Sequence, residues 1–385
     1  MKEKTLDAGH RGALSYIVHN PADNVRLVAG ADTDEGVLKF FKEKFGPDVL
    51  VTMDYKELLA QRDIDAVFIT TPDYCHEEHT IAALKAGKHV YLEKPMAITT
   101  EGCDRILRTA YETGRKLYLG HNMRHMGFVL KMKELIDKGA IGEVKTAWCR
   151  HFISYGGDAY FMDWHADRRY SNGLLLQKAS HDIDVLHWLC GGYTTVTHAM
   201  GGLTVYNQVK DRHQGKWPSF KERWKETNWP PLSQKQLNPI IDVEDVSMMN
   251  MQLDNGVFAC YQQCHFTPDA WRNYTIIGTE GRIENFGDYP YCPGQCVIRV
   301  WNKRTGYNAY GDEQYCVELQ EGEHGGADTA IVKEFIQYIR GDCEIKTSAI
   351  AARNSVATAC AATESLRNGG VPVNVPPVPK DLMLP

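Results

Sequence analysis

An apolar run, a Thr-Pro turn, a helical segment and a second apolar run follow one another between residues 66 and 96, and this order constrains the fold most. The first run is Ala66–Ile69, and the second ends at Leu92. Parallel strands need a helical crossover of this kind, and their carboxyl ends meet at one edge, where ligands bind. The sequence therefore predicts a βαβ unit whose binding edge carries Thr71-Pro72 and Glu93-Lys94-Pro95.

Lys94 comes directly after the second run, and Pro95 ends the strand there. A lysine in this place can be desolvated and tuned for proton transfer. The plain alternative is a solvated loop lysine paired with Glu93, and a lone Glu-Lys-Pro tripeptide favours that alternative. The order of the other motifs decides between the two.

Glu93-Lys94-Pro95 after a Thr71-Pro72 turn resembles the signature of the Gfo/Idh/MocA family, nicotinamide-dependent oxidoreductases that act mainly on sugars and cyclitols. The resemblance runs from Gly9 to about Pro376. Its most specific parts also include a helix with His181 and a turn at Gly278, in the family's order. We therefore favour the functional interpretation of Lys94.

Composition sets the class of protein. A chain of 385 residues is long enough for two domains, and 43% apolar with 24% charged residues is typical of a soluble globular protein. No apolar run reaches membrane-spanning length, and Met1–Thr5 lacks an apolar signal region, so we expect a cytoplasmic protein without a membrane partner. A net charge of -6 argues against a nucleic-acid partner.

Cysteine and histidine spacing predicts no metal site. The eleven cysteines form no CxxC pair, so reduced thiols are favoured over disulfides or structural zinc. The histidines do not cluster at metal spacing either.

Residues 1–125 are expected to form a Rossmann-like, doubly wound parallel sheet. Strands are predicted at 25–32 and 49–52, and helices at 35–45 and 55–61, before the βαβ unit. The phosphate loop departs from the family pattern, because Gly9, His10, Arg11 and Gly12 follow Asp7 instead of a glycine. The preceding Met1–Leu6 is too polar for a good central strand.

Asp32 supports dinucleotide binding more directly. It lies twenty residues beyond Gly12, at the end of the strand predicted at 25–32, where a carboxylate accepts hydrogen bonds from the adenosine ribose. Its neighbours Thr33 and Asp34 offer no cation for a 2'-phosphate, so NAD is favoured over NADP. A helix N-cap aspartate is the alternative.

A further strand at 116–119 leads to Asn122 and Arg124, which match the family's Asn-x-Arg pattern beside the nicotinamide; strand-end capping is the alternative. The resemblance implies a set of cofactor-binding residues from the first domain. They are Gly9, His10, Arg11, Gly12, Asp32, Thr71, Pro72, His76, Glu93, Lys94 and Asn122.

Residues 126–385 are expected to form an α+β domain with an open, largely antiparallel sheet. Strands are predicted at 143–151, 246–253, 257–265 and 274–278, with a hairpin turn at Asp254-Asn255-Gly256. The resemblance implies that this domain binds substrate and forms a homo-oligomer, a dimer or a tetramer. A helix at 349–366 should pack back on the first domain.

The helix predicted at 173–189 carries Gln177, Lys178 and His181 among apolar residues. Burying these polar groups is costly unless they meet a polar ligand, although a satisfied core histidine and a snorkelling lysine are the alternative. The segment resembles the family's Asp-x-x-x-His element, in which the histidine lies near the substrate carbinol carbon. Gln177 replaces the aspartate, which leaves the usual proton relay without its carboxylate.

Other candidate substrate contacts lie nearby in the sequence. Residues 164–170 are rich in aromatic and guanidinium side chains, and His324 precedes two glycines at a predicted helix start. Residues 208–239 are expected to be an insertion that forms a lid, a rim or a subunit contact. The expected substrate contacts are Lys94, Arg124, Trp164, His165, Arg168, Gln177, Lys178, His181 and His324, with Lys94 and His181 catalytic.

These features together predict an NAD-dependent oxidoreductase that transfers hydride between a ring secondary hydroxyl of a sugar, glycoside or cyclitol and nicotinamide. One alternative is a glycosidase of the same family that uses transient oxidation at C3 and elimination. The other is a family member without catalysis, for which Asp7 and Gln177 are the indications.

Overall fold

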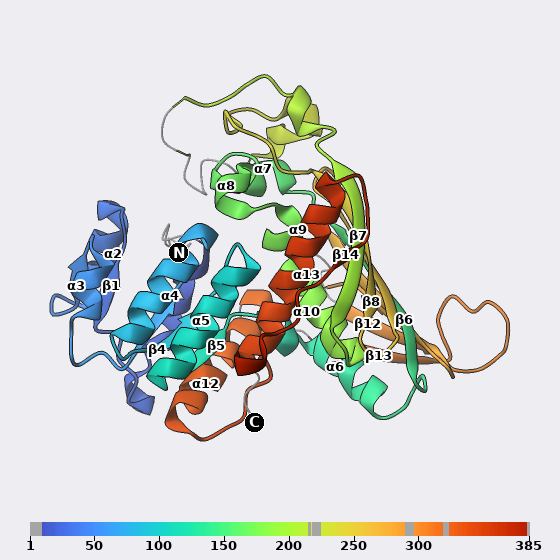
Figure 1. Cartoon of the computed structure of the whole chain (residues 1–385), viewed down its shortest axis with the longest axis horizontal. Coiled ribbons are helices and arrows are strands. Elements are labelled where there is room, and N and C mark those ends of the chain that lie inside the picture. The colour runs from blue at the N-terminus through green and yellow to red at the C-terminus, as the bar shows by residue number, and fades with distance from the viewer. Residues whose placement is uncertain (1–9, 215–216, 218–224, 289–295, 319–322, 383–385) are drawn as a thin grey trace.

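A group of short parallel strands and a large, mostly antiparallel sheet form the two halves of the molecule (Figure 1). The computed structural model describes residues 10–214, 217, 225–288, 296–318 and 323–382. Met1–Leu6, Asp7 and Gly9 lie outside the described residues. No helix among those described is long and apolar enough to cross a membrane.

The first half is the expected Rossmann-like region. Strands β1 (Ala29–Ala31) and β2 (Leu50–Thr52) pair in parallel, and β3 (Ala66–Ile69), β4 (His89–Leu92) and β5 (Leu117–Leu119) form a second parallel group. The strand predicted at 25–32 is therefore shorter than expected, and it is only partly buried. Within the described ranges, no ladder joins the two groups.

Helices connect these strands as the alternation predicts. They are α1 (Leu14–Val18), α2 (Glu35–Phe45), α3 (Tyr55–Leu59), α4 (His76–Lys85) and α5 (Thr100–Thr113). Asp34 caps α2, because its carboxylate accepts hydrogen bonds from the backbone amides of Gly36 and Val37. Thr99 caps α5 in the same way.

The second half contains a nine-stranded sheet in the order β13-β12-β11-β10-β6-β9-β8-β7-β14. All neighbours are antiparallel except β6 and β9, which confirms the predicted sheet type. The strands are β6 (Val144–Phe152), β7 (Thr194–Gly202), β8 (Val246–Leu253), β9 (Phe258–Cys264), β10 (Trp271–Gly278), β11 (Arg282–Phe286), β12 (Cys296–Trp301), β13 (Glu313–Val317) and β14 (Val373–Asn374).

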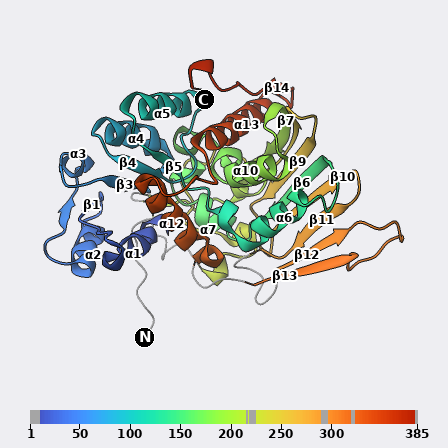
Figure 2. The same ribbon diagram turned by 90° about the horizontal axis from the view of Figure 1, so that it is seen from below.

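Helices cover one face of this sheet and connect it to the first half (Figures 1 and 2). Helices α6 (Gly127–Asp137), α10 (Ala179–Cys190) and α13 (Ala349–Arg367) contribute to one buried apolar cluster with β4, β5 and α5. Helix α12 (Ala327–Arg340) places Phe335 against Tyr91 and Tyr118 of the parallel strands. The two halves therefore share their core.

The helix predicted at 173–189 is not continuous, which corrects the expectation from its apolar spacing. It consists of α9 (Leu174–Gln177) and α10, and the helix is interrupted at Lys178. The carbonyl of Gln177, at the break, accepts a hydrogen bond from the Nζ of Lys94 at 2.8 Å. The break thus lets a backbone group of one half meet a lysine of the other.

Candidate active site

Lys94 lies at the carboxyl edge of the parallel strands, as the βαβ pattern predicts. Ile69 of β3 is in register with Leu92 of β4, so the segments that follow the two strands emerge side by side. Burial lowers the pKa of Lys94 from its usual value, and the charge of Asp73 opposes that shift. A lysine with a lowered pKa can give and take a proton near neutral pH.

Three polar side chains near Lys94 have unused hydrogen-bonding atoms. Among the described residues, Asp73 Oδ2, Gln177 Oε1 and His181 Nδ1 are buried and have no hydrogen-bond partner. Leaving such atoms unpaired costs about 1–3 kcal/mol each, so they fit a ligand that carries several hydroxyl groups.

Two histidines lie together beside the lysine. The rings of His121 and His181 meet edge to face with 5.8 Å between their centroids. Burial lowers the pKa of both, and the positive charge of Lys94 lowers it further, so both imidazoles are neutral near pH 7. His121 was missed in the sequence, although it directly follows a predicted strand end as Asn122 does.

Lys178 lies at the helix break between two tyrosines. Its Nζ donates to Tyr155 Oη at 3.2 Å, and it faces the rings of Tyr155 and Tyr160 at 5.5 and 5.6 Å from their centroids. Burial and the nearby Arg272 lower the pKa of Lys178 to about 7. Within the described ranges it forms no ion pair, so its charge is available to a ligand.

A buried charge cluster fixes the start of α10. Asp182 accepts hydrogen bonds from His151 at 3.0 Å and from Tyr274, and its carboxylate pairs with Arg272 at 2.8 Å. Burial alone would raise the pKa of Asp182, but Arg272 and His151 hold it below the usual value. Asp182 therefore stays ionised and anchors the turn of helix that carries His181.

Trp164 and His165 form an aromatic wall. Their rings stack with 3.6 Å between centroids, and Tyr74 contacts Trp164 at 5.9 Å. The imidazole of His165 is held by Asp163, with Nδ1 2.7 Å from Oδ1. Arg168, by contrast, is exposed and paired with Asp242 at 3.0 Å.

Arg11 connects the expected phosphate loop to the carboxyl edge of the parallel strands. Its guanidinium pairs with Glu93 at 2.8 Å and with Asp328 at 2.7 Å. Asp328 also accepts from Asn122 at 3.0 Å and lies 2.9 Å from Nδ1 of His324. This cluster joins three expected cofactor residues to an expected substrate residue. His10 and Gly12 belong to a 3-10 turn at His10–Ala13 that precedes α1.

His76 and Arg124 are saturated by protein contacts. The ring nitrogens of His76 lie 2.6 Å from the Pro95 carbonyl and 2.8 Å from that of Thr71, so this histidine ties the two strand-end loops together. Arg124 forms a two-pronged pair with Asp184 at 2.7 Å. The polar atoms of both side chains are therefore engaged by protein groups. Pro72 precedes the 3-10 turn Asp73–Cys75.

The residues at this edge fit a dinucleotide. The Nη2 of Arg11 is buried without a hydrogen-bond partner in the described structure, and an anionic diphosphate supplies acceptors for such a group. Asp32 lies directly after β1, where its Oδ1 accepts from the amide of Asp34 at 2.9 Å. A bound NAD would supply a hydride acceptor at this edge.

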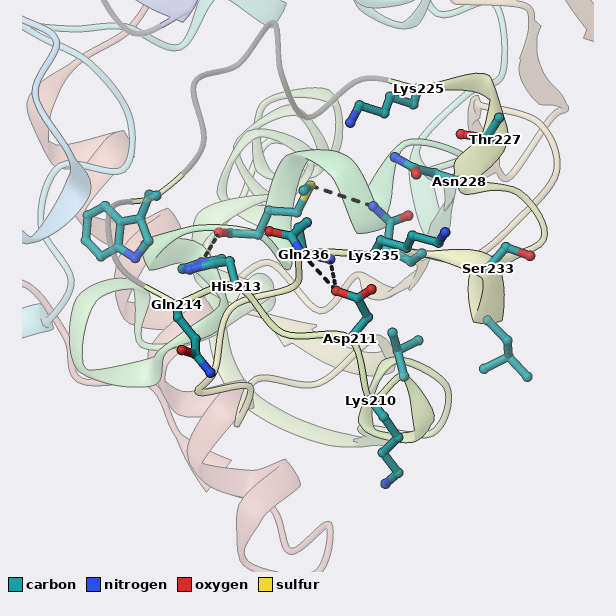
Figure 3. Close-up of a pocket in the computed structure, with 15 residues that line it drawn as sticks. Lys210, Asp211, His213, Gln214, Lys225, Thr227, Asn228, Ser233, Lys235 and Gln236 are labelled. Carbon is teal, nitrogen blue, oxygen red and sulfur yellow. Dashed lines mark hydrogen bonds between the residues drawn. The ribbon is translucent and has the colours of Figure 1, made fainter.

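A large hollow lies apart from this edge, within the insertion (Figure 3). Its volume is about 1080 Å³, and Met162, His213 and Trp217 are among its lining residues. His213 donates its Nε2–H to the Met162 carbonyl, 3.0 Å away. None of the residues that surround Lys94 lines it.

Family profiles match most of the chain. A profile described as the oxidoreductase family, NAD-binding Rossmann fold, matches residues 9–121. A second, described as the oxidoreductase family, C-terminal alpha/beta domain, matches residues 133–375. Both are Gfo/Idh/MocA profiles.

Several known proteins are similar over long stretches. The putative oxidoreductase YteT of Bacillus subtilis (strain 168) is 24% identical over 317 residues, 73% of this chain and 74% of that protein. The inositol 2-dehydrogenase/D-chiro-inositol 3-dehydrogenase of Halalkalibacterium halodurans is 31% identical over 173 residues, 45% of this chain and 47% of that protein. The match to the second relative thus spans about half of its length.

Among solved structures, a levoglucosan dehydrogenase in complex with NADH and levoglucosan has a TM-score of 0.73 at 20% identity and covers 94% of both chains. At that identity the likeness shows the fold. The resemblance seen in the sequence motifs is confirmed by the profiles, and the chain belongs to the Gfo/Idh/MocA family of oxidoreductases with an NAD-binding Rossmann fold.

Proposed function

We propose that this protein is an NAD-linked oxidoreductase that moves hydride between a ring secondary hydroxyl carbon of a sugar, glycoside or cyclitol and nicotinamide. The observation that carries the proposal is the position of Lys94. Its amine, with a lowered pKa, lies at the carboxyl edge beside unpartnered polar atoms of Gln177 and His181. The names of the relatives, inositol and levoglucosan dehydrogenases among them, support the same substrate class.

Lys94 would take the hydroxyl proton as the carbinol is oxidised, and return it in the reverse direction. His181 is neutral, so its imidazole would orient the same hydroxyl and would not repel a developing positive charge on Lys94. Closing water out of this edge strengthens both interactions.

NAD is preferred over NADP in this proposal because of the acids at the end of β1. Asp32 would accept the ribose hydroxyls, and the exposed Asp34 beside it would repel a 2'-phosphate. The expected phosphate-loop residues Gly9, His10, Arg11 and Gly12 would bind the diphosphate. Thr71, Pro72, Glu93 and Asn122 would bind the nicotinamide half of the cofactor.

Trp164 and His165 would hold the apolar face of a sugar ring, and Lys178 would hold an oxygen at the opposite side. An anionic substituent on the ring would suit Lys178, because this lysine forms no ion pair in the described structure. Glucuronate should then turn over faster than glucose. Equal turnover of the two would remove the anionic preference and leave the oxidoreductase proposal in place.

We further propose that the protein acts in the cytoplasm as a homo-oligomer. The face of the nine-stranded sheet that no helix of the described residues covers exposes Met200 of β7 beside its partner Met248 of β8, with Phe258 of β9 farther along the same face. Apolar side chains gathered on an uncovered sheet face favour burial between subunits.

The test is a panel of myo-inositol, glucose, levoglucosan, glucuronate and a nitrophenyl glucoside, each mixed with NAD and purified protein. We expect NADH to accumulate with at least one member. In Lys94→Met the rate should fall about 10²- to 10⁴-fold, while the affinity for NADH stays unchanged.

Other outcomes would overturn the proposal. Release of nitrophenol without net NADH would favour the glycosidase alternative. Failure to bind NAD at all would favour the family member without catalysis.

A further inference from the structure

The carboxylate that the family pattern places four residues before His181 is absent here, and the structure offers another one. Position 177 holds a glutamine, whose amide cannot accept a proton. Its backbone carbonyl accepts from Lys94 at 2.8 Å, but within the described ranges no carboxylate forms an ion pair with Lys94. A lysine that must shed a proton at each turnover needs a partner to receive it.

Asp73 is placed to be that partner. It follows the Thr71-Pro72 turn after β3, while Lys94 follows β4, and these two strands are paired in register. The Asp73 side chain is 5% exposed, and its Oδ2 is buried without a hydrogen-bond partner in the described structure. A buried carboxyl oxygen with no partner is costly unless a proton or a ligand reaches it.

The charges around the pair are of both signs. The pKa of Asp73 responds to three charged neighbours. Lys94, after β4, lowers it, whereas Asp163, beside the aromatic wall, and Glu93 raise it. The pKa of Lys94 is raised by Asp73 and Glu93 and lowered by Lys178 and Arg11. The neutral His181 and His121 also face this lysine. Burial raises the pKa of Asp73 and lowers that of Lys94, so the two groups compete for one proton near neutral pH.

We infer that Asp73 is the positioning carboxylate that exchanges a proton with Lys94 during turnover, in place of an acid at position 177. The inference rests on the proposed function. The substrate hydroxyl gives its proton to the neutral Lys94 amine as the carbinol carbon gives its hydride to NAD. The Lys94 ammonium then passes that proton through a water molecule to the Asp73 carboxylate, because the two groups form no direct ion pair in the described structure. The Asp73 carboxyl releases the proton to solvent, which regenerates the starting state.

The experiment measures the coupling without cofactor or substrate. The rate at which acetic anhydride labels Lys94 is followed against pH by peptide mass spectrometry, because only the neutral amine reacts. In Asp73→Asn the midpoint should fall by about one pH unit or more, since a carboxylate that favours the ammonium has been removed. Asp73→Ser gives the same reading should the asparagine variant not fold.

Two further variants serve as rescue and control. The double variant Asp73→Asn/Gln177→Glu should move the midpoint back toward the wild type, because it returns a carboxylate to the family's position. Asp32→Asn removes an acid that follows β1, in the other parallel group, and should leave the midpoint unchanged. A labelling midpoint that is the same in Asp73→Asn as in the wild type would overturn the inference.

Turnover separates this inference from the proposed function. With a panel member that reduces NAD, Asp73→Asn should lower kcat about tenfold or more, move its acid limb to lower pH and leave KM unchanged. Wild-type turnover with an unshifted pH profile in Asp73→Asn would overturn the relay and leave the oxidoreductase standing. A labelling shift without NAD reduction by any polyol would overturn both.

Discussion

At the scale of single residues, the site is a balance between burial and charge. Full burial shifts a lysine pKa by up to about 3–5 units, whereas one opposite charge nearby returns about 1–3 units. Burial lowers the pKa of Lys94, and the negative charges of Asp73 and Glu93 oppose part of that shift, so the pKa stays near neutral pH. Burial, and then the like charge of Arg272, lower the pKa of Lys178 to about 7.

Asp32 gives a prediction about cofactor choice. Replacing it with alanine removes a charge-assisted hydrogen bond worth about 1.5–3 kcal/mol, so we expect NADH to bind about 10- to 100-fold more weakly. NADPH should lose much less, because its 2'-phosphate no longer meets that carboxylate. Fluorescence titration of both nucleotides measures the change.

A matched variant controls for damage to the loop. Asp34→Ala removes the cap of α2 instead of the ribose contact, so it should lower thermal stability more than NADH affinity. Equal NADH affinity in Asp32→Ala and wild type would contradict the assignment of Asp32.

The sequence predicted the residues whose position follows from strand order. Lys94 and His181 come together as the motif order indicates. Asp73 was not found, because its importance depends on what it faces across the strand edge and not on its own spacing. The ion pair between Arg124 and Asp184 could not be predicted from the sequence either, since the two residues are 60 positions apart.

At the scale of elements, α13 joins the two halves through a buried ion pair. Arg353 of α13 is 1% exposed and pairs with Asp104 of α5 at 2.8 Å. Its guanidinium also donates to the carbonyls of Pro376 and Pro377. One side chain thus connects a helix of the second half, a helix of the first and the C-terminal segment.

Arg353→Met should lower the melting temperature markedly. It leaves Asp104 without its partner, and breaking a buried pair costs about 3 kcal/mol or more, which is roughly 4 °C or more for a protein of this size. Differential scanning calorimetry measures the shift. Arg105 lies on α5 like Asp104, and Arg105→Met breaks its more exposed pair with Glu77 of α4 and should change little. Equal effects of the two variants would contradict the role given to α13.

Element type followed from the sequence more reliably than element ends. The hairpin at 254–256 and the tight turn at Gly278 were predicted, because the glycines at these turns leave few alternatives. The interruption at Lys178 was not predicted, because the apolar spacing continues from α9 into α10. A tertiary contact, from Lys94 to the Gln177 carbonyl, lies at the point where helix propensity is overridden.

At the scale of the whole molecule, buried histidines set the response to acid. Burial lowers the pKa of eight described histidines below the usual value, to about 4 for His187 and about 3 for His151. The others are His76, His79, His89, His121, His181 and His265.

The protein should therefore lose stability as the pH falls from about 7 to 5. The unfolded chain binds protons at these histidines near pH 6.5 while the folded chain does not. Each fully buried histidine contributes up to about 1.4 kcal/mol per pH unit until the pH reaches its folded-state pKa, and the partly exposed His79 and His89 contribute less. Asp32, Asp73, Asp158 and Asp288, whose pKa values are raised, oppose the trend but are fewer. A melting temperature at pH 5 equal to or above that at pH 7.5, at constant ionic strength, would contradict this account.

The uncovered sheet face gives a prediction about assembly. Native mass spectrometry of the wild type should find a dimer or a tetramer. Met248→Lys places a charge beside Met200 on the neighbouring strand and should shift the population toward the monomer. Lys303→Met changes a residue beyond the end of β12 and serves as the control. A monomeric wild type at micromolar concentration would remove this proposal.

The central claim is that hydride leaves a ring carbinol carbon at the site of Lys94. It is tested most directly by mass spectrometry of the cofactor after turnover of a panel substrate deuterated at its carbinol carbons. We predict that the wild type returns NADH carrying one deuterium, and that Lys94→Met does so about 10²- to 10⁴-fold more slowly. Unlabelled cofactor in the wild type, or an equal rate in Lys94→Met, would contradict the account.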